Sequence, residues 1–210
     1  MLDANGLGLY LCIGSEFLEG RSLKAILEEA IFGGVTMIQV REKTASSLEF
    51  YNITRAALEV TKARKVPLVV NDRLDIALAA GADGLHLGQS DLPLQTAKKI
   101  AGGKLFIGAS AGTLEEALAA EKDGADYLGA GAVFPTGSKA DAGNAIGLEQ
   151  FGKICAAVHI PVIGIGGIGL QNAAEVMKSG AAGIAVISAI LSQSNIKAAA
   201  QNLRQKQLNV

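Results

Sequence analysis

The chain has 210 residues, of which 50% are hydrophobic, 19% are charged and 4% are aromatic. This composition excludes a disordered chain, because apolar residues are too abundant. It also excludes a disulfide-stabilised scaffold, since the two cysteines, Cys12 and Cys155, lie far apart in the sequence. We expect no nucleic-acid partner, because 19 basic residues face 20 acidic ones without a basic block.

The first residues and the longest uncharged segment both argue against a membrane protein. No basic segment followed by an apolar one opens the sequence, so we predict no signal peptide. Residues 154–174 contain no Asp, Glu, Lys or Arg and are long enough to cross a bilayer, but Pro161 and several glycines interrupt them. We therefore expect a cytoplasmic protein without membrane contacts. The sequence leaves its oligomeric state open, a homo-oligomer included.

Short apolar runs alternate with amphipathic segments along the chain. At residues 33–38, 81–85, 124–128 and 180–184 a glycine ends a helix-like run and an apolar run soon begins. Such runs are typical of parallel strands buried on both faces. In chain order, the predicted strands are 9–13, 37–40, 68–70, 84–87, 105–108, 127–130, 162–165 and 183–187. The predicted helices are 21–32, 46–64, 73–80, 93–101, 113–123, 148–158, 170–179 and 196–205.

Eight strand–helix units predict an α/β protein with a parallel sheet covered by helices. We interpret residues 1–210 as a compact single-domain (β/α)8 TIM barrel, smaller than the usual size of about 250 residues. An open doubly wound sheet is the alternative. The segment from Gly164 to Gly167 resembles a dinucleotide-binding turn only in part, since its spacing is not G-x-G-x-x-G.

In a barrel, the loops after the C-terminal ends of the strands carry the chemistry. The second predicted strand leads to Gln39, Arg41 and Lys43, which alternate and so share one face of an extended segment. Two cations at a barrel mouth suit a multiply charged anion. The alternative is a solvated loop with local ion pairs, and the sequence alone does not separate the two.

Two aspartates follow the next two strands. Asp72 and Asp91 come just after neighbouring predicted strands, which lie about 4.8 Å apart in a parallel barrel. Carboxylates held that close repel each other unless a proton or a cation lies between them. Carboxylate oxygens with room for water and phosphate suit Mg²⁺. Alternatively, each aspartate caps the helix that follows it.

Hydroxyl and glycine residues follow the later strands. Ser110 closes the fifth strand, and the run from Thr136 to Lys139 offers two hydroxyls, a glycine and a cation, although it is not a Walker loop. Gly167 and Ser188 follow the last two strands, where barrels commonly bind a monophosphate through backbone N–H groups. Ordinary turn glycines are the alternative. His86, between apolar neighbours, favours a core or pocket-wall residue over a catalytic base.

Taken together, these segments resemble the thiamine-phosphate synthase family over residues 10–190. The segments that carry the resemblance are Gln39-Val40-Arg41-Glu42-Lys43, Val70-Asn71-Asp72-Arg73, Gly84-Leu85-His86-Leu87-Gly88-Gln89-Ser90-Asp91, Gly108-Ala109-Ser110, Gly124-Ala125-Asp126-Tyr127, Phe134-Pro135-Thr136-Gly137-Ser138-Lys139, Gly164-Ile165-Gly166-Gly167-Ile168 and Ile187-Ser188-Ala189-Ile190. The family is a (β/α)8 barrel that joins 4-amino-2-methyl-5-hydroxymethylpyrimidine diphosphate to a thiazole monophosphate and releases diphosphate.

The resemblance implies a role for each matching residue and small molecules as partners. The residues it assigns to the pyrimidine diphosphate are Gln39, Arg41, Lys43, Asn71, Ser110 and Lys139. Those it assigns to the thiazole phosphate are Thr136, Ser138, Gly167, Ile187 and Ser188, and Gly137 is a further substrate-binding residue. Asp72 and Asp91 would hold Mg²⁺. Catalysis would rest on Arg41, Lys43, Ser110 and Lys139, which stabilise the charge of the departing diphosphate.

Three alternatives to a synthase remain open from the sequence. The related thiazole tautomerases share the barrel but rely on a histidine two positions after the fifth-strand serine, where this chain has Gly112. Gly112 also replaces a histidine frequent in the synthases, and Ser138 replaces a threonine. A barrel that binds a phosphorylated heterocycle without turnover would explain both departures. A sugar-phosphate isomerase would need a carboxylate or cysteine base, and no candidate stands out.

Overall fold

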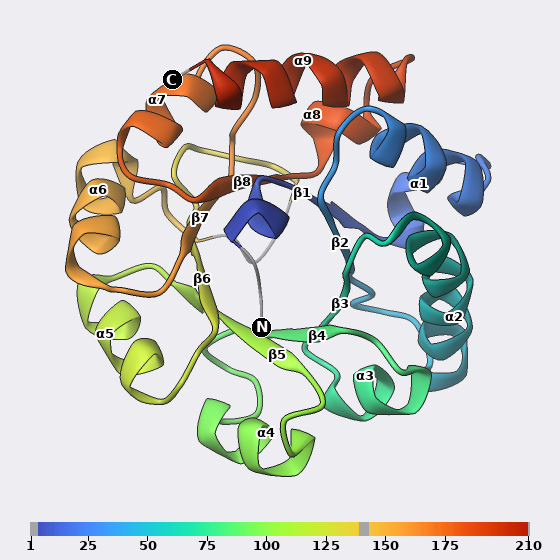
Figure 1. Cartoon of the computed structure of the whole chain (residues 1–210), viewed down its shortest axis with the longest axis horizontal. Coiled ribbons are helices and arrows are strands. Elements are labelled where there is room, and N and C mark those ends of the chain that lie inside the picture. The colour runs from blue at the N-terminus through green and yellow to red at the C-terminus, as the bar shows by residue number, and fades with distance from the viewer. Residues whose placement is uncertain (1–3, 139–142, 210) are drawn as a thin grey trace.

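The protein folds as a closed barrel of eight parallel strands surrounded by helices (Figure 1). The computed structural model describes residues 4–138 and 143–209. Its strands are β1 (Leu9–Ile13), β2 (Met37–Val40), β3 (Leu68–Asn71), β4 (Gly84–Leu87), β5 (Phe106–Ala111), β6 (Tyr127–Gly131), β7 (Val162–Ile165) and β8 (Gly183–Val186). Each strand pairs with the next, and β8 pairs with β1, so the sheet has no free edge. The predicted (β/α)8 fold is confirmed, and an open sheet is excluded.

The helices lie outside the ring of strands (Figure 1). They are α1 (Leu23–Phe32), α2 (Ser47–Arg64), α3 (Leu74–Ala80), α4 (Leu94–Ala101), α5 (Leu114–Lys122), α6 (Gly147–Ala157), α7 (Ala173–Lys178), α8 (Ser188–Leu191) and α9 (Ile196–Leu208), with the 3₁₀ turns η1 (Ala4–Leu7) and η2 (Ser15–Phe17). Among the described residues, none of the helices combines the length and the apolar character needed to span a bilayer.

The predicted elements occur in the predicted order, and the largest differences in their bounds are in β5, α7 and α9. β5 continues to Ala111, because Ser110 and Ala111 pair with Gly129 and Ala130 of β6. These residues are small, so no apolar run in the sequence indicates that the strand continues. β8 ends one residue earlier than predicted, since Ile187 is already the N-cap of the unpredicted helix α8. These differences leave the order and number of the strands unchanged.

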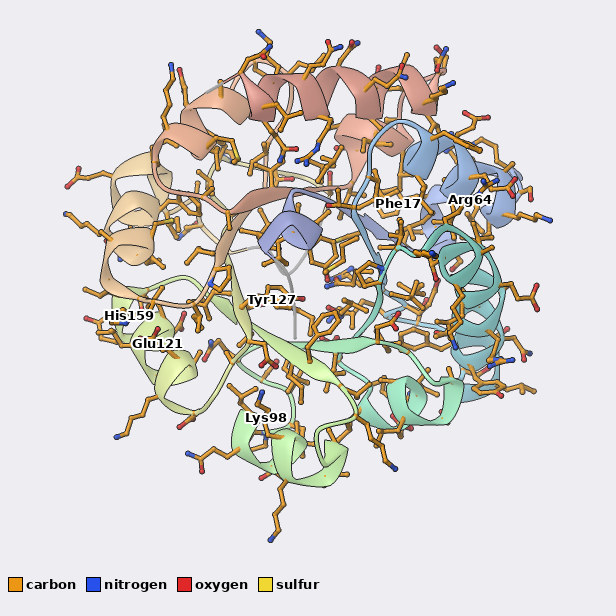
Figure 2. All side chains as sticks on the ribbon, viewed as in Figure 1. Phe17, Arg64, Lys98, Glu121, Tyr127 and His159 are labelled. Atoms are coloured by element: carbon orange, nitrogen blue, oxygen red, sulfur yellow. The ribbon has the colours of Figure 1, made fainter. Side chains whose placement is uncertain are left out.

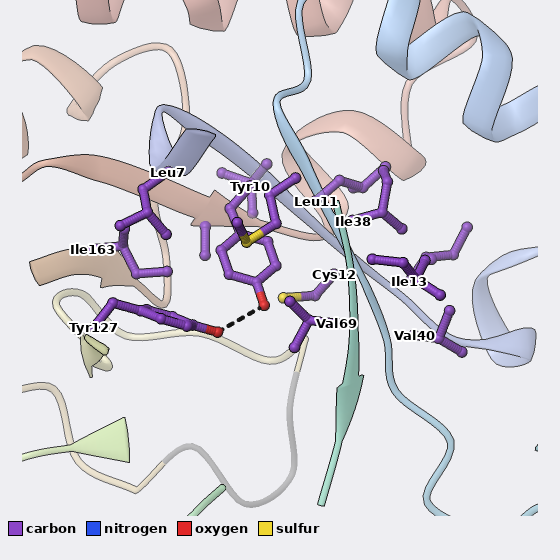
Figure 3. Packing of buried hydrophobic residues seen from close by; sticks show 14 of the residues in the cluster. Leu7, Tyr10, Leu11, Cys12, Ile13, Ile38, Val40, Val69, Tyr127 and Ile163 are labelled. Atoms are coloured by element: carbon purple, nitrogen blue, oxygen red, sulfur yellow. Dashed lines mark hydrogen bonds between the residues drawn. The ribbon is translucent and has the colours of Figure 1, made fainter. Parts of the chain in front are cut away.

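The interior of the barrel is apolar except for a few hydroxyl and amide groups. Tyr10 of β1 and Tyr127 of β6 are both fully buried and their hydroxyl oxygens lie 3.0 Å apart (Figure 3). In Figure 2 Tyr127 lies within the ring of strands, whereas Lys98 and His159 lie among the outer helices. Burial raises the pKa of both phenols, so both hydroxyls stay protonated at neutral pH.

Two strand glycines leave room for aromatic rings. A methyl group at Gly108 of β5 would overlap the Tyr127 ring, and one at Gly84 of β4 would overlap the Phe106 ring. The Phe106 and Tyr127 rings themselves pack at a centroid distance of 6.3 Å. Glycine in β4 and β5 therefore makes room for the large rings carried by the next strands, β5 and β6.

Candidate active site

One cavity of about 1040 Å³ opens at the C-terminal ends of the strands. It brings together residues that lie up to 161 positions apart in the chain, since Arg41 and Asn202 both line it. The predicted site residues on its wall are Arg41, Lys43, Asn71, Asp72, Asp91, Ser110, Thr136, Gly137, Ser138, Gly167, Ile187 and Ser188. The strand ends thus place these side chains around one space, as a barrel requires.

Two predicted site residues are not among the described residues that line the cavity. Gln39 lies deeper in β2, is 3% exposed, and donates from Nε2 to the Tyr10 hydroxyl at 2.8 Å. Side chains alternate along a strand, so Gln39 and Arg41 do lie on one face. However, Gln39 pairs with Val69 inside the sheet, whereas Arg41 comes directly after the end of β2. Lys139 lies outside the described residues.

The two predicted metal ligands lie beside each other at the ends of β3 and β4. Asp72 Oδ2 accepts from Lys43 Nζ at 2.6 Å, and Asp91 Oδ2 accepts from the Gly88 backbone N–H at 2.7 Å. Burial, followed by the neighbouring Asp72, raises the pKa of the Asp91 carboxyl. Bringing the two carboxylates together therefore costs free energy that a bound cation would recover. This donor set fits Mg²⁺, which needs only one or two carboxylates besides water and phosphate oxygens.

The alternative role of these aspartates as helix caps finds no support. The residue at the N-cap of α3 is Arg73 and that of α4 is Pro93, and neither helix has a side-chain capping hydrogen bond. Asp91 instead holds the turn at Gly88. Within the described residues, no third His, Cys, Asp or Glu joins the pair, so any further ligands would come from solvent or substrate.

Hydroxyl and glycine residues from the segments after β6, β7 and β8 form another part of the wall. Ser138 Oγ lies 2.9 Å from Ser188 Oγ, which connects the loop after β6 to the start of α8. Gly167 has a positive φ of 64°, and a Cβ there would lie 2.7 Å from Phe134 Cβ and from the Pro135 carbonyl oxygen. Only glycine fits this close approach, which keeps the loops after β6 and β7 together.

Polar side chains around Ser110 hold it from two sides. His86 Nε2 lies 3.0 Å from Ser110 Oγ, and Gln89 Nε2 donates to the Ser110 carbonyl oxygen at 2.6 Å. Both residues line the cavity. His86 is a pocket-wall residue, as its apolar neighbours predict, but its contact with Ser110 could not be deduced from the sequence, because β4 and β5 meet only through their register.

A buried carboxylate inside the cation motif has a role that the sequence does not reveal. Glu42 is 8% exposed and accepts from the Ser15 backbone N–H at 2.7 Å and from Ser15 Oγ at 2.8 Å. These bonds tie the segment after β2 to the turn after β1. Glu42 therefore fixes the backbone between Arg41 and Lys43, and its place inside the motif was the only signal of this role.

The segment between α8 and α9 forms a wall of the cavity that the sequence did not predict. The lining residues of this segment are Ser192, Gln193, Ser194 and Asn195, and the first turns of α9 add Ala198, Ala199 and Asn202. They belong to no predicted strand end, because α8 inserts a helical turn between β8 and the outer helix α9. The run of four small polar residues before α9 was the available signal.

Comparisons with known proteins agree with this geometry. The family model described as thiamine monophosphate synthase matches residues 9–190. The thiamine-phosphate synthase of Clostridium botulinum (strain Loch Maree / Type A3) is 52% identical over 196 residues, covering 93% of this chain and 96% of that protein. The thiamine-phosphate synthase of Alkaliphilus oremlandii (strain OhILAs) is 50% identical, with 94% of each chain covered.

Solved structures give the same result at the level of the fold. Thiamine phosphate pyrophosphorylase from Pyrococcus furiosus superimposes with a TM-score of 0.90 at 46% identity, covering 98% of both chains. The 3-hexulose-6-phosphate synthase from Salmonella typhimurium reaches a TM-score of 0.75 at 17% identity, covering 97% of this chain and 99% of that one, and so shares the fold alone. The family match over most of the barrel, together with the residues around its cavity, shows that this chain belongs to the thiamine monophosphate synthase family.

Proposed function

We propose that the chain is a thiamine-phosphate synthase, a transferase that condenses 4-amino-2-methyl-5-hydroxymethylpyrimidine diphosphate with 4-methyl-5-(2-phosphoethyl)thiazole. The products would be thiamine phosphate and diphosphate. The observation that carries this proposal is the meeting of two cations, two adjacent carboxylates and several hydroxyls in one cavity. Relatives at about 52% identity over most of the chain bear the same name.

The pyrimidine diphosphate would bind where Arg41, Lys43 and Asn71 line the cavity. Arg41 offers a planar fork of N–H donors and Lys43 a point charge, which suit phosphate oxygens. In this part of the cavity the two cations are offset by the two carboxylates. A bound diphosphate anion therefore needs a further positive charge. Mg²⁺ held by Asp72 and Asp91 would supply that charge to the diphosphate oxygens.

Catalysis would consist of stabilising charge as it separates. The bond between the pyrimidine methylene carbon and the diphosphate oxygen breaks, its electron pair leaves with the diphosphate, and the methylene becomes cationic. Arg41 and Lys43, and Lys139 by family resemblance, would stabilise the leaving anion. The thiazole nitrogen then attacks the methylene carbon, so the protein needs no side-chain nucleophile.

The thiazole phosphate would lie against the loops after β6, β7 and β8. Ser138, Gly167 and Ser188 line the cavity there. Their hydroxyl and backbone N–H groups can donate to a monophosphate without adding a net charge. Holding both substrates in one cavity places the attacking nitrogen near the methylene carbon and replaces an encounter in solution by a step within one complex.

A thiazole tautomerase is the second candidate, and the position after β5 argues against it. Gly112 stands where the tautomerases carry their histidine, and its backbone N–H donates to Glu116 Oε2 at 2.6 Å. A Cβ at Gly112 would find no atom closer than 3.6 Å, so the space for a side chain exists but no base fills it. The chain keeps the carboxylate pair, which a tautomerase does not need.

The direct test is coupling of the two substrates by the purified chain, with labelled pyrimidine diphosphate. We expect thiamine phosphate and diphosphate in equal amounts, loss of turnover in EDTA, and recovery when Mg²⁺ is added back. No product at saturating substrates and Mg²⁺ would reject the proposal. In that case calorimetry tests whether the chain is a non-catalytic binding protein. Such a protein would bind the thiazole phosphate tightly but show no Mg²⁺-dependent binding of the pyrimidine diphosphate.

A further inference from the structure

A chain of hydrogen bonds crosses the interior of the barrel and ends at the cavity. Gln39 Nε2 donates to the Tyr10 hydroxyl at 2.8 Å, and the Tyr10 and Tyr127 hydroxyl oxygens lie 3.0 Å apart. The Tyr127 hydroxyl lies 3.0 Å from His86 Nδ1, and His86 Nε2 lies 3.0 Å from Ser110 Oγ. The chain thus links β2, β1, β6, β4 and β5, and Figure 3 shows its central bond between the two tyrosines.

The distances alone leave the donors in this chain open, and a count of hydrogens favours one direction. Each tyrosine hydroxyl has one hydrogen to donate, and burial keeps both phenols protonated. Because the Tyr10 oxygen accepts from the Gln39 amide, its hydrogen is available for the Tyr127 oxygen. In this direction Tyr127 donates to His86 Nδ1, and this nitrogen then lacks a hydrogen.

A neutral imidazole that accepts at Nδ1 carries its hydrogen on Nε2. His86 therefore donates from Nε2 to Ser110 Oγ, and the Ser110 oxygen is occupied as an acceptor. Its own hydrogen is left to point toward the cavity that Ser110 lines. Gln89 also holds Ser110, by donating from Nε2 to the Ser110 carbonyl oxygen. In the opposite direction Ser110 would donate its hydrogen to His86 and would have none left for an anionic ligand.

We propose that His86 is a positioning residue that acts through Ser110: it holds the serine hydroxyl as a hydrogen-bond donor toward the substrate, in an orientation set by the chain from Gln39 through the two tyrosines. This role deepens the proposed synthase activity and rests on it. It also gives Gln39 a function inside the barrel, where it begins the chain instead of lining the described cavity wall.

The tautomer can be measured without turnover. The ¹⁵N chemical shifts of the two imidazole nitrogens distinguish Nδ1–H from Nε2–H, and the sequence contains only one other histidine. His159 has a 96% exposed side chain, so His159→Gln provides the assignment without disturbing the core. We expect Nε2 of His86 to carry the hydrogen at neutral pH. A hydrogen on Nδ1 would overturn the proposal.

A pair of variants separates positioning from packing. The side-chain amide of glutamine reaches about as far as histidine Nε2, whereas that of asparagine reaches only as far as Nδ1. His86→Gln can still donate to Ser110, and His86→Asn can still accept from Tyr127. We expect His86→Asn to lower kcat about tenfold or more with little change in KM, and His86→Gln to stay within a few-fold of the parent. Equal values, or a better His86→Asn, would overturn the proposal.

The same pair in a Ser110→Ala background tests whether His86 acts through Ser110. There the two variants should have the same kcat, and a remaining difference would contradict the proposed route. Thermal unfolding of each variant shows whether it folds. If His86→Asn does not fold, the ¹⁵N measurement on the parent chain still decides. If the parent forms no thiamine phosphate, the proposed function fails, while the tautomer measurement still tests the hydrogen-bond chain.

Discussion

At the scale of single residues, the carboxylate pair is the feature that most constrains the chemistry. Asp91 lies beside Asp72 and its pKa is raised by burial and by that neighbour. Asp91→Asn keeps the shape of the side chain and an oxygen that accepts from the Gly88 backbone N–H. It removes only the negative charge.

We therefore expect Asp91→Asn to remain folded but to lose coupling activity by a factor on the order of 10² or more, together with Mg²⁺-dependent binding of diphosphate. Steady-state kinetics and calorimetry check both. Asp75→Asn is a matched control, because the Asp75 side chain is exposed in the first turn of α3 and pairs with Arg73 outside the cavity. Undiminished activity of Asp91→Asn would remove the metal assignment.

The sequence predicts single residues well where a strand ends and less well where strands meet. Asp72, Asp91 and Ser110 each follow a clear apolar run, and the barrel geometry alone brings them to one rim. The contacts of His86 with Tyr127 and of Glu42 with Ser15 depend on register and on loop shape. Neither leaves a periodic signal in a single sequence.

At the scale of elements, side-chain hydrogen bonds to the backbone decide where the helix α7 begins. The helix predicted from Leu170 begins only at Ala173, because the Asn172 side chain accepts from the Gly169 N–H and donates to the Gly167 carbonyl oxygen. These bonds hold a turn that competes with the helix. The amphipathic pattern reaches further toward the N-terminus than the hydrogen bonds allow.

The close approach of β5 and β6 gives a stability prediction. Gly108→Ala would drive a methyl group into the Tyr127 ring, so we expect the free energy of unfolding to fall by about 1–3 kcal/mol. Urea titration measures it. Gly112→Ala, just after the same strand, has no atom within 3.6 Å of its new Cβ and should change stability far less. Equal destabilisation of the two variants would show that the ring contact is not the cause.

The capping box of α2 gives a pH-dependent prediction. Glu49 accepts from the Ser46 hydroxyl and backbone N–H, and these bonds lower the pKa of its carboxyl below the ordinary value of 4.5. Since the pKa is lower in the folded state, the ionised carboxylate stabilises the fold above the unfolded pKa and loses that effect as the pH falls through the folded pKa.

Glu49→Gln should therefore be less stable than the parent at pH 7, and the gap should shrink on acidification below the ordinary carboxyl pKa. Urea unfolding of both chains from pH 7 down to pH 3 measures the gap directly. Other titrating groups affect both chains alike and cancel in the difference. A gap that stays constant over this range would contradict a contribution from the ionised carboxylate.

At the scale of the whole molecule, closure of the barrel is what turns scattered motifs into a site. β8 pairs with β1, so the segment after β2 and the loops after β7 and β8 face the same cavity. The alternation of apolar runs and helices was sufficient to predict this closure. The wall between α8 and α9 was not predicted, because the four-residue helix α8 has no periodic pattern.

The central claim is that Arg41, Lys43 and the two aspartates surround one diphosphate and its metal ion. A crystal structure with diphosphate and Mn²⁺ in place of Mg²⁺ tests it most directly, since anomalous scattering locates the manganese. We predict one anomalous peak between Asp72 and Asp91, with diphosphate oxygens on the metal and on the Arg41 and Lys43 side chains. Diphosphate bound outside this cavity, or a metal that contacts neither aspartate, would contradict the account.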